Sequence, residues 1–170
     1  DEVVDAAVIT NKDEILLVSK NGMSLRFQAD DESLRPMGRS STGVIGMKFR
    51  KGDELLSMSA IKEDKKPKFV LTATDGGFAK RTPLDEYRQQ GRGGIGVKAA
   101  KVDENSRGVL VGAMIVEESD EILAITSGGV VMRTAVKEIR ETGRDTMGVR
   151  LVNLDPGISV VSIAQVKDEE

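Results

Sequence analysis

The fold of this chain is decided by three related stretches: LRPMGRSSTGV at residues 34–44, YRQQGRGGIGV at 87–97 and IRETGRDTMGV at 139–149. Each contains an apolar residue, Arg, two variable residues, Gly-Arg, three variable residues and Gly-Val. The Gly-Arg arginines are 53 and then 52 residues apart, and self-similarity at such a period is typical of repeat architectures. We call these stretches the first, second and third arginine segments, and they predict three structural units.

A β-hairpin is predicted ahead of each arginine segment. Apolar runs lead into residues that tolerate positive φ, as tight hairpin turns require. The three pairs are Ile15–Ser19 with Asn21-Gly22, Phe69–Thr74 with Asp75-Gly76-Gly77, and Ile122–Thr126 with Ser127-Gly128-Gly129. A second strand is expected after each turn, ending on a basic residue: Arg26, Arg81 or Arg133.

A further strand is predicted before each hairpin, at Ala6–Ile9, Leu55–Ile61 and Val109–Val116. A last apolar run, Ser159–Val166, either opens a fourth unit or completes a neighbouring one. The units are therefore placed at about 3–52, 53–107 and 108–156, followed by a terminal strand at 159–166 and an acidic end at 168–170.

About four short strands per unit predict an all-β fold of three antiparallel, propeller-like blades plus a terminal strand, in a ring that three blades leave open. A solenoid of stacked β-units is the structural alternative. Thr82-Pro83-Leu84 predicts one helical turn, with Thr as its cap and Pro in its first turn.

The composition excludes several kinds of site. Cysteine and histidine are both absent, which removes disulfides, thiolate metal sites and the usual general base. No apolar run is long enough to span a bilayer and no signal peptide opens the chain, so a cytosolic location is expected. The first residue is Asp rather than Met, so the chain is expected to be a piece of a longer protein.

Positive charge is confined to the same part of every repeat. Residues 22–51, 77–101 and 129–150 together hold 17 basic and 8 acidic residues, a net charge of +9. The remaining 8 basic and 20 acidic residues give −12, so the overall charge is −3. If the repeats are arranged around an axis, their basic parts face outward alike and form a basic rim, with acidic surface elsewhere. Such a rim suits the phosphates of a polyanion, and because aromatic residues are only 3% of the chain, duplex DNA fits better than a stacked single strand.

The candidate DNA contacts are the basic residues of these parts of the repeat: Arg35, Arg39, Lys48, Arg50, Lys51, Lys80, Arg81, Arg88, Arg92, Lys98, Lys101, Arg133, Arg140, Arg144 and Arg150. Two roles stay open for the most regular of them, Arg39, Arg92 and Arg144. Each either approaches a phosphate from a glycine-rich loop or binds a neighbouring carbonyl or carboxylate. We expect charge reversal at Arg39 to unfold the chain, and reversal at Arg50 and Lys51 to affect binding alone.

Three sites that the sequence suggests at first sight do not survive comparison between the repeats. Gly91–Gly96 matches a dinucleotide-binding pattern, but it lacks the preceding strand that such a site needs, and the other copies lack its middle glycine. Tyr87 is the only tyrosine, yet Leu34 and Ile139 take its place in the other segments, so it is expected to pack in the core. The acidic pairs, such as Glu117-Glu118, do not recur as a metal or acid–base site.

The repeated Gly-Arg pattern, with Lys80-Arg81-Thr82-Pro83-Leu84 ahead of Gln90–Gly96, resembles the C-terminal domain of bacterial DNA gyrase A across essentially the whole chain. The resemblance implies a β-pinwheel, a propeller-like disc whose neighbouring blades exchange a strand. The family domain usually has six blades, so this chain is similar to its C-terminal half.

For function, the resemblance implies a rim that wraps duplex DNA and supports ATP-dependent negative supercoiling. No catalytic residue, metal site or cofactor is expected in this part of the enzyme. The expected partners are duplex DNA, the rest of the gyrase A polypeptide and gyrase B, in a heterotetramer with no membrane contact. The expected location is the bacterial cytoplasm, associated with the nucleoid.

The chain departs from the family's hallmark box, which reads Gln, basic, Arg, Gly, Gly, basic, Gly. Here Gln90, Arg92, Gly93, Gly94 and Gly96 fit, whereas Gly91 and Ile95 stand at the two basic positions. The second arginine segment is thus a degenerate box, and a complete one is expected upstream. Two alternatives stay open: the corresponding domain of topoisomerase IV, and a propeller-type protein-interaction module.

Overall fold

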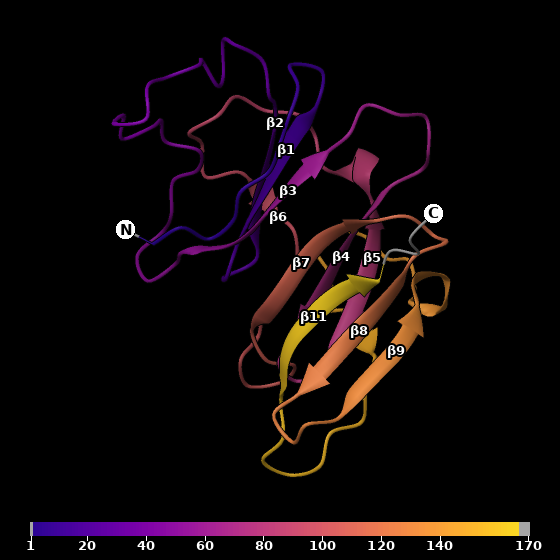
Figure 1. Ribbon diagram of the computed structural model, residues 1–170. Coiled ribbons are helices and arrows are strands. Elements are labelled where there is room, and N and C mark those ends of the chain that lie inside the picture. The colour runs from indigo at the N-terminus through magenta and orange to yellow at the C-terminus, as the bar shows by residue number, and fades with distance from the viewer. Residues whose placement is uncertain (1, 167–170) are drawn as a thin grey trace.

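The computed structural model describes residues 2–166 and contains three antiparallel sheets (Figure 1). The first sheet has the order β3 (Leu55–Ile61), β1 (Glu14–Ser19), β2 (Met23–Gln28) and β6 (Val97–Lys98). The second has the order β10 (Val149–Arg150), β5 (Phe78–Pro83), β4 (Phe69–Thr74) and β7 (Leu110–Val116). The third has three strands among the described residues: β11 (Val160–Val166), β8 (Glu121–Thr126) and β9 (Val131–Ala135). The all-β, blade-like architecture is as predicted.

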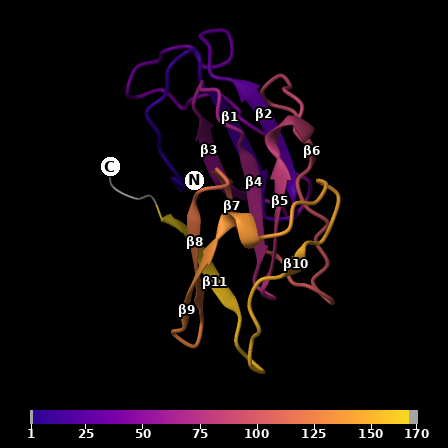
Figure 2. The same ribbon diagram turned by 90° about the vertical axis from the view of Figure 1, so that its right-hand side faces the viewer.

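One edge strand of each sheet lies on the inner side of the molecule. Strand β3 contacts β7, and β7 contacts β11, so the last-paired strand of each sheet lies against its neighbours. At the opposite edge of the first two sheets lie the two-residue strands β6 and β10, which are the ends of the second and third arginine segments. Both appear on the right-hand side of the molecule in Figure 2. We call this outer side, formed by the arginine segments and the strands that they contribute, the rim.

Each complete sheet takes its fourth strand from the following repeat. Met23 of β2 is the register partner of Lys98 in β6, and Phe78 of β5 is the partner of Arg150 in β10. The glycine turns of the hairpins reinforce the exchange, because the Gly22 carbonyl accepts the Ala99 amide at 2.7 Å. Gly22 has φ near +80°, and a Cβ there would come within 2.7 Å of the Ala100 carbonyl oxygen, so glycine suits the turn on both counts.

Strand β3 pairs with β1 of the hairpin before it, rather than with the hairpin after it. The sheets are therefore shifted by one strand relative to the units 3–52, 53–107 and 108–156. Likewise β11 joins the third hairpin through β8, which is the second of the two roles considered for the last apolar run. The acidic end at 168–170 lies outside the described residues.

The strand predicted at Ala6–Ile9 is wrong. These residues form no strand, and Val8 is 90% exposed. The physical reason is that a strand opening the first unit would pair with β1, and both edges of β1 are already occupied by β2 and β3.

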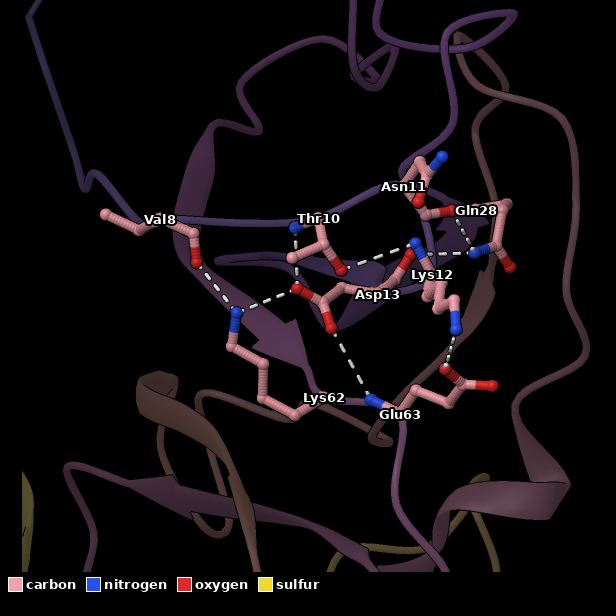
Figure 3. Close-up of polar contacts among 8 residues, drawn as sticks. All are labelled: Val8, Thr10, Asn11, Lys12, Asp13, Gln28, Lys62 and Glu63. Carbon is pink, nitrogen blue, oxygen red and sulfur yellow. Dashed lines mark hydrogen bonds and ion pairs between the residues drawn. The ribbon is translucent and has the colours of Figure 1, made fainter.

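The N-terminal segment is held instead by the buried carboxylate of Asp13 (Figure 3). Its Oδ2 atom accepts hydrogen bonds from the Thr10 amide at 2.8 Å and from Lys62 Nζ at 2.7 Å. Lys62 Nζ also donates to the Val8 carbonyl at 2.7 Å. The hydrogen bond from Lys62, aided by that from Thr10, lowers the pKa of Asp13 from 3.8 to about 2.

Most of the apolar core lies between sheets. Tyr87 packs in one cluster with Leu16 and Val18 of the first sheet and Val70 of the second, and Ile139 occupies the matching position at the next junction. Tyr87 is 1% exposed and its hydroxyl donates to the Ala99 carbonyl at 3.3 Å. This burial confirms the predicted packing role of Tyr87, and it raises the pKa of the Tyr87 hydroxyl to about 12.

The helical turn predicted after β5 is present as a 3-10 turn at Leu84–Glu86, and Val136–Glu138 forms its counterpart in the third repeat. The cap assignment was wrong, because Pro83 occupies the cap position and no side chain caps the turn. Thr82 lies inside β5 and is fully buried. Among residues 2–166, no helix is long and apolar enough to cross a membrane.

Candidate nucleic-acid interface

The Gly-Arg arginines tie consecutive arginine segments together. Arg144 Nη1 donates to the carbonyl oxygen of Lys98 at 2.7 Å, and Arg92 Nη1 donates to that of Ile45 at 2.5 Å. Lys98 and Ile45 occupy the same position of their segments, one residue after the Gly-Val pair. Arg92 also donates through Nε to the Ser33 carbonyl at 2.7 Å. For Arg92 and Arg144, the structure shows the carbonyl-binding role of the two left open.

The hairpin arginines form a second tie at the same junctions. Arg26 Nη1 donates to the carbonyl of Tyr87 at 3.0 Å, and Arg81 Nε donates to that of Ile139 at 2.9 Å. Each arginine also pairs with a carboxylate: Arg26 with Glu14, and Arg81 with Glu118 at 3.1 Å. The apolar residue that opens an arginine segment is thus bound through its own carbonyl.

Two of the predicted DNA contacts are buried. Lys80 is 1% exposed, and its Nζ donates to the carbonyls of Gly143, at 2.8 Å, and Arg144. Arg81 is 8% exposed and lies over the Phe69 ring. Both side chains donate to carbonyls of the third arginine segment and so hold it against the second sheet. Neither side chain is exposed to contact DNA. Burial lowers the pKa of Lys80 from 10.5 to about 8.

The other arginine of the motif behaves in the opposite way. Arg35, Arg88 and Arg140 each follow the apolar residue that opens a segment, and all three are exposed. Among residues 2–166, none of the three side chains makes a hydrogen bond or ion pair with the protein. The buried neighbours Tyr87 and Ile139 fix the backbone beneath Arg88 and Arg140, which leaves both guanidinium groups in solvent. The motif therefore holds one structural and one solvent-facing arginine.

More exposed basic residues lie along the rim. Lys98 in β6 and Arg150 in β10 occupy equivalent positions, and Arg150 rests on the Phe78 ring 4.8 Å from its centroid. Lys101 follows β6, while three basic residues close together follow the first arginine segment: Lys48, Arg50 and Lys51. All of these side chains remain available to a polyanion. Lys98 does form a 3.4 Å ion pair with Asp145, but both side chains of that pair are exposed, so the pair is weak and can be exchanged for a phosphate.

Arg39 belongs to the first arginine segment and Arg133 to the third hairpin. Arg39 is exposed and, within residues 2–166, makes no side-chain hydrogen bond, because no earlier arginine segment lies beside it. The structural role predicted for Arg39 therefore belongs to Arg92 and Arg144. Arg133 pairs with Glu121, and within residues 2–166 its side chain donates to no carbonyl.

The backbone of the degenerate box is engaged with the protein. The Gly93 amide donates to the Gly46 carbonyl at 2.7 Å, and the Gly94 carbonyl accepts the Lys48 amide at 2.8 Å. The segment is followed by the two-residue strand β6 rather than by a helix, which agrees with the rejection of a dinucleotide site. In the box, Gln90 is partly buried, whereas Gly91 and Ile95 are exposed.

One structural arginine could not be found from the repeat. Arg107 donates to the Gly148 carbonyl and lies over Phe78, 4.7 Å from the ring centroid, while Arg150 also contacts that ring. Arg107 lies outside the arginine segments and precedes Gly108 as Lys51 precedes Gly52, but the third repeat has Pro156 before Gly157, so the basic residue does not recur in all three repeats. The described residues include no group of three or more acidic side chains placed to hold a metal ion.

Comparisons with known proteins agree with this architecture. The family model described as "DNA gyrase C-terminal domain, beta-propeller" matches residues 13–62, 68–117 and 120–167. The DNA gyrase A protein of Streptomyces coelicolor is 59% identical over 97% of this chain, and that of Mycolicibacterium smegmatis is 50% identical over the whole chain. The chain spans about a fifth of the length of these relatives, 19% and 20%.

Solved structures give the same result. A DNA gyrase A C-terminal domain superposes with a TM-score of 0.82 at 28% identity, covering 92% of this chain and 52% of that one. A topoisomerase IV C-terminal domain gives 0.83 at 25% identity, covering 92% and 47%. The family match covers most of the chain, in three segments that each begin at a hairpin, and so the chain belongs to the DNA gyrase C-terminal domain family of β-propeller proteins.

Proposed function

We propose that this chain binds duplex DNA along its rim and bends it, as a non-catalytic part of DNA gyrase that supports negative supercoiling. The observation that carries the proposal is the set Arg35, Arg88 and Arg140. These residues occupy the same position in three repeats, and within the described chain none of their side chains has a hydrogen-bond or ion-pair partner in the protein. A guanidinium group held in solvent by a buried neighbour is free to contact a phosphate, and three along one rim can follow a backbone.

The electrostatics support contact with phosphates rather than with bases. Arg92 and Arg144 donate to main-chain carbonyls, so these two arginines are not free to hydrogen-bond to base edges, and the basic side chains left on the rim are solvent-exposed. Lysine and arginine along such a surface release counterions from DNA, which produces affinity that depends on salt but not on sequence. Phe49 is the only aromatic among the exposed large apolar residues of the described chain, so a stacking platform for single strands has little support.

The curved arrangement of the repeats supports bending. Strands β3, β7 and β11 of successive sheets lie against one another, and β6 and β10 lie on the same outer side (Figure 2), so equivalent positions of successive repeats follow one another along that side. A duplex held by equivalent contacts on this surface has to curve with it. Bending costs elastic energy, and additional phosphate contacts made along the bend offset it.

The remaining parts of the proposal concern the whole enzyme. Since the chain corresponds to about a fifth of its gyrase A relatives, cleavage and ATP hydrolysis are assigned to other regions of the enzyme. The chain is proposed to act with the rest of the gyrase A polypeptide and with gyrase B in the bacterial cytoplasm, near the nucleoid. No cofactor is expected to bind within it.

The decisive experiment is a salt titration of duplex binding by the chain and by a triple variant, R35A/R88A/R140A. The expected result is weaker binding and a shallower dependence of log affinity on log salt, by about 0.9 for each phosphate that is no longer neutralised. The matched control is K12A/K20A/K66A, which changes the net charge equally at exposed lysines paired with Glu63, Glu54 and Glu117. Circular dichroism should show that both variants stay folded.

Two results would count against the proposal. If the unmodified chain shows no binding at low salt, the rim does not bind DNA on its own. If the triple variant and the control lose affinity equally, binding depends on net charge and not on the registered arginines. A folded chain that fails both tests would favour the protein-interaction alternative.

A further inference from the structure

The second and third arginine segments differ at the backbone amide of their Gly-Arg arginine. In the third segment, the Arg144 amide donates to Oε2 of Glu86 at 3.0 Å. Within residues 2–166, the Arg92 amide at the equivalent position of the second segment makes no hydrogen bond. Both segments contribute a strand to the sheet of the preceding repeat, so the difference arises between two junctions that are both complete.

The carboxylate at the third segment comes from the preceding repeat. Glu86 ends the 3-10 turn at Leu84–Glu86, directly before the residue that opens the second segment. Ser33 holds the same position before the first segment, 53 residues earlier. It binds the second segment through its main-chain carbonyl, which accepts Arg92 Nε at 2.7 Å, and within the described chain its hydroxyl makes no hydrogen bond. A serine therefore stands beside the second segment where a glutamate stands beside the third.

The glycine before each of these arginines shows the same contrast. A Cβ at Gly143 would lie 3.6 Å from Glu86 Oε2, whereas a Cβ at Gly91 would meet nothing within 4 Å. The space that the carboxylate fills beside the third segment is thus open beside the second. Gly91 is exposed, so solutes can reach this space.

The group bound at the third segment indicates which ligand suits the second. Carboxylates and phosphates both present anionic oxygens, which accept charge-assisted hydrogen bonds from backbone amides. A basic residue also lies beside each loop: the Lys48 amide donates to the Gly94 carbonyl at 2.8 Å. Its counterpart, the Lys101 amide, donates to the Thr146 carbonyl at 3.1 Å. Both lysines are exposed, so each loop combines an amide with nearby positive charge.

The bond between Glu86 and the Arg144 amide can exchange. Glu86 is exposed, and among the described residues its carboxylate forms no ion pair. A single hydrogen bond of this kind contributes little in water, because water replaces it readily. A phosphate of a duplex that is held elsewhere on the rim would compete with the carboxylate for this amide.

We propose that the Arg92 amide binds a phosphate oxygen of duplex DNA, and that Glu86 competes for the same site at the Arg144 amide. This inference rests on the proposed DNA binding of the rim and adds that successive repeats contribute unequally. The second segment accepts a phosphate directly, whereas at the third segment a phosphate first has to displace a carboxylate. The degenerate box is then the stronger of the two contacts, although Gly91 and Ile95 replace its basic residues.

Amide NMR resonances test the assignment directly. In proton–nitrogen spectra of the unmodified chain, a short duplex should shift the Arg92 amide more than the Arg144 amide. In E86S, which places serine as at the first junction, the Arg144 amide should respond as well. The control E141S removes the same charge from an exposed glutamate of the third segment and should leave the Arg144 response unchanged. The proposal is overturned if Arg92 does not respond to bound duplex, or if Arg144 responds equally with and without Glu86.

Duplex affinity provides the second test. E86S should bind severalfold more tightly than E141S, and this ratio should persist as salt increases, because a hydrogen bond from a neutral amide releases no counterions. The reverse change, S33E, should bind more weakly than S40E, which adds the same charge at an exposed serine of the first segment. Equal affinities within each pair would overturn this inference alone. If the unmodified chain binds no duplex at low salt, the proposed function fails and this inference fails with it.

Discussion

Arg144 reaches back along the rim to Lys98, where its Nη1 atom donates a 2.7 Å hydrogen bond to the main-chain carbonyl. The bond joins the third arginine segment to the strand that the second segment contributes. We expect R144A, and R92A at the equivalent position, to lower the free energy of unfolding by about 1–2 kcal/mol, since each removes a charge-assisted hydrogen bond. R39A should change it by less than about 0.5 kcal/mol, because the Arg39 side chain makes no such bond within residues 2–166. Urea unfolding at low protein concentration measures all three, and an equal cost for R39A would contradict the assignment.

Lys80 should make stability depend on alkaline pH. K80M removes the donor for the Gly143 and Arg144 carbonyls and should cost about 1–3 kcal/mol at neutral pH. Because burial lowers the pKa of Lys80 from 10.5 to about 8, the unfolded chain binds more protons than the folded one between these values. The stability of the unmodified chain should therefore rise relative to K80M as the pH increases from 8 to 10.5. A constant difference across that range would show that Lys80 titrates normally.

Asp13 should make the N-terminal sheet sensitive to acid. Its pKa lies near 2 in the folded state against an ordinary 3.8, so the stability that it contributes is complete above 3.8 and is lost as the pH falls toward 2. The advantage of the unmodified chain over D13N should shrink across that window. Denaturant unfolding at several pH values measures it, and comparison with D13N removes the contribution of other carboxylates. A difference that does not change with pH would exclude the bond from Lys62 as the cause.

The last glycine of each arginine segment should differ in importance. Gly96 and Gly148 have φ of +84° and +80°, and a Cβ would overlap the Ser24 carbonyl or lie 2.6 Å from that of Ala79. We expect G96A and G148A to lower the melting temperature clearly more than G43A, which has the same positive φ but open space around it. Thermal unfolding followed by circular dichroism checks the order, and equal costs at the three positions would mean that backbone strain alone determines the result.

The irregular basic residues after the first segment should matter for DNA alone. Arg50 and Lys51 are exposed, and within the described residues their side chains have no protein partner. R50E/K51E should keep the unfolding free energy within about 0.5 kcal/mol while weakening duplex binding severalfold at low salt. The control K65E/K66E makes the same change in charge at two adjacent exposed lysines that lie outside the three basic parts of the repeat. Equal losses of affinity in both variants would argue against a local contact.

Much of this fold could be predicted from local patterns, because a tight turn between two apolar runs determines its own pairing. The hairpins at Asn21-Gly22 and Asp75-Gly76-Gly77 are formed as expected. The partner of Leu55–Ile61 could not be read in the same way, because its pairing with β1 depends on which sheet edge is free. The Ala6–Ile9 strand failed for that reason.

The site shows a similar division. Repetition identified the arginines, but it could not tell Arg88 from Arg92, since both recur in every copy. The difference arises in three dimensions: Arg92 faces the carbonyl of Ile45, whereas Arg88 follows a residue whose own side chain is buried. Lys80 was misassigned because a lysine near a motif looks the same in sequence whether its ammonium group meets solvent or two carbonyls.

The exchange of outer strands also sets an order of assembly during synthesis. The first hairpin and β3 are complete once Ile61 has left the ribosome, but their sheet lacks its edge until Lys98 follows, after the second hairpin. The first and second sheets are therefore completed only after the next hairpin has been synthesised, and their last strand pairs with a strand that is distant in sequence. A truncation between the hairpin and the arginine segment of one repeat would leave the previous repeat unfinished, so the effect of losing a segment would appear one sheet upstream of the cut.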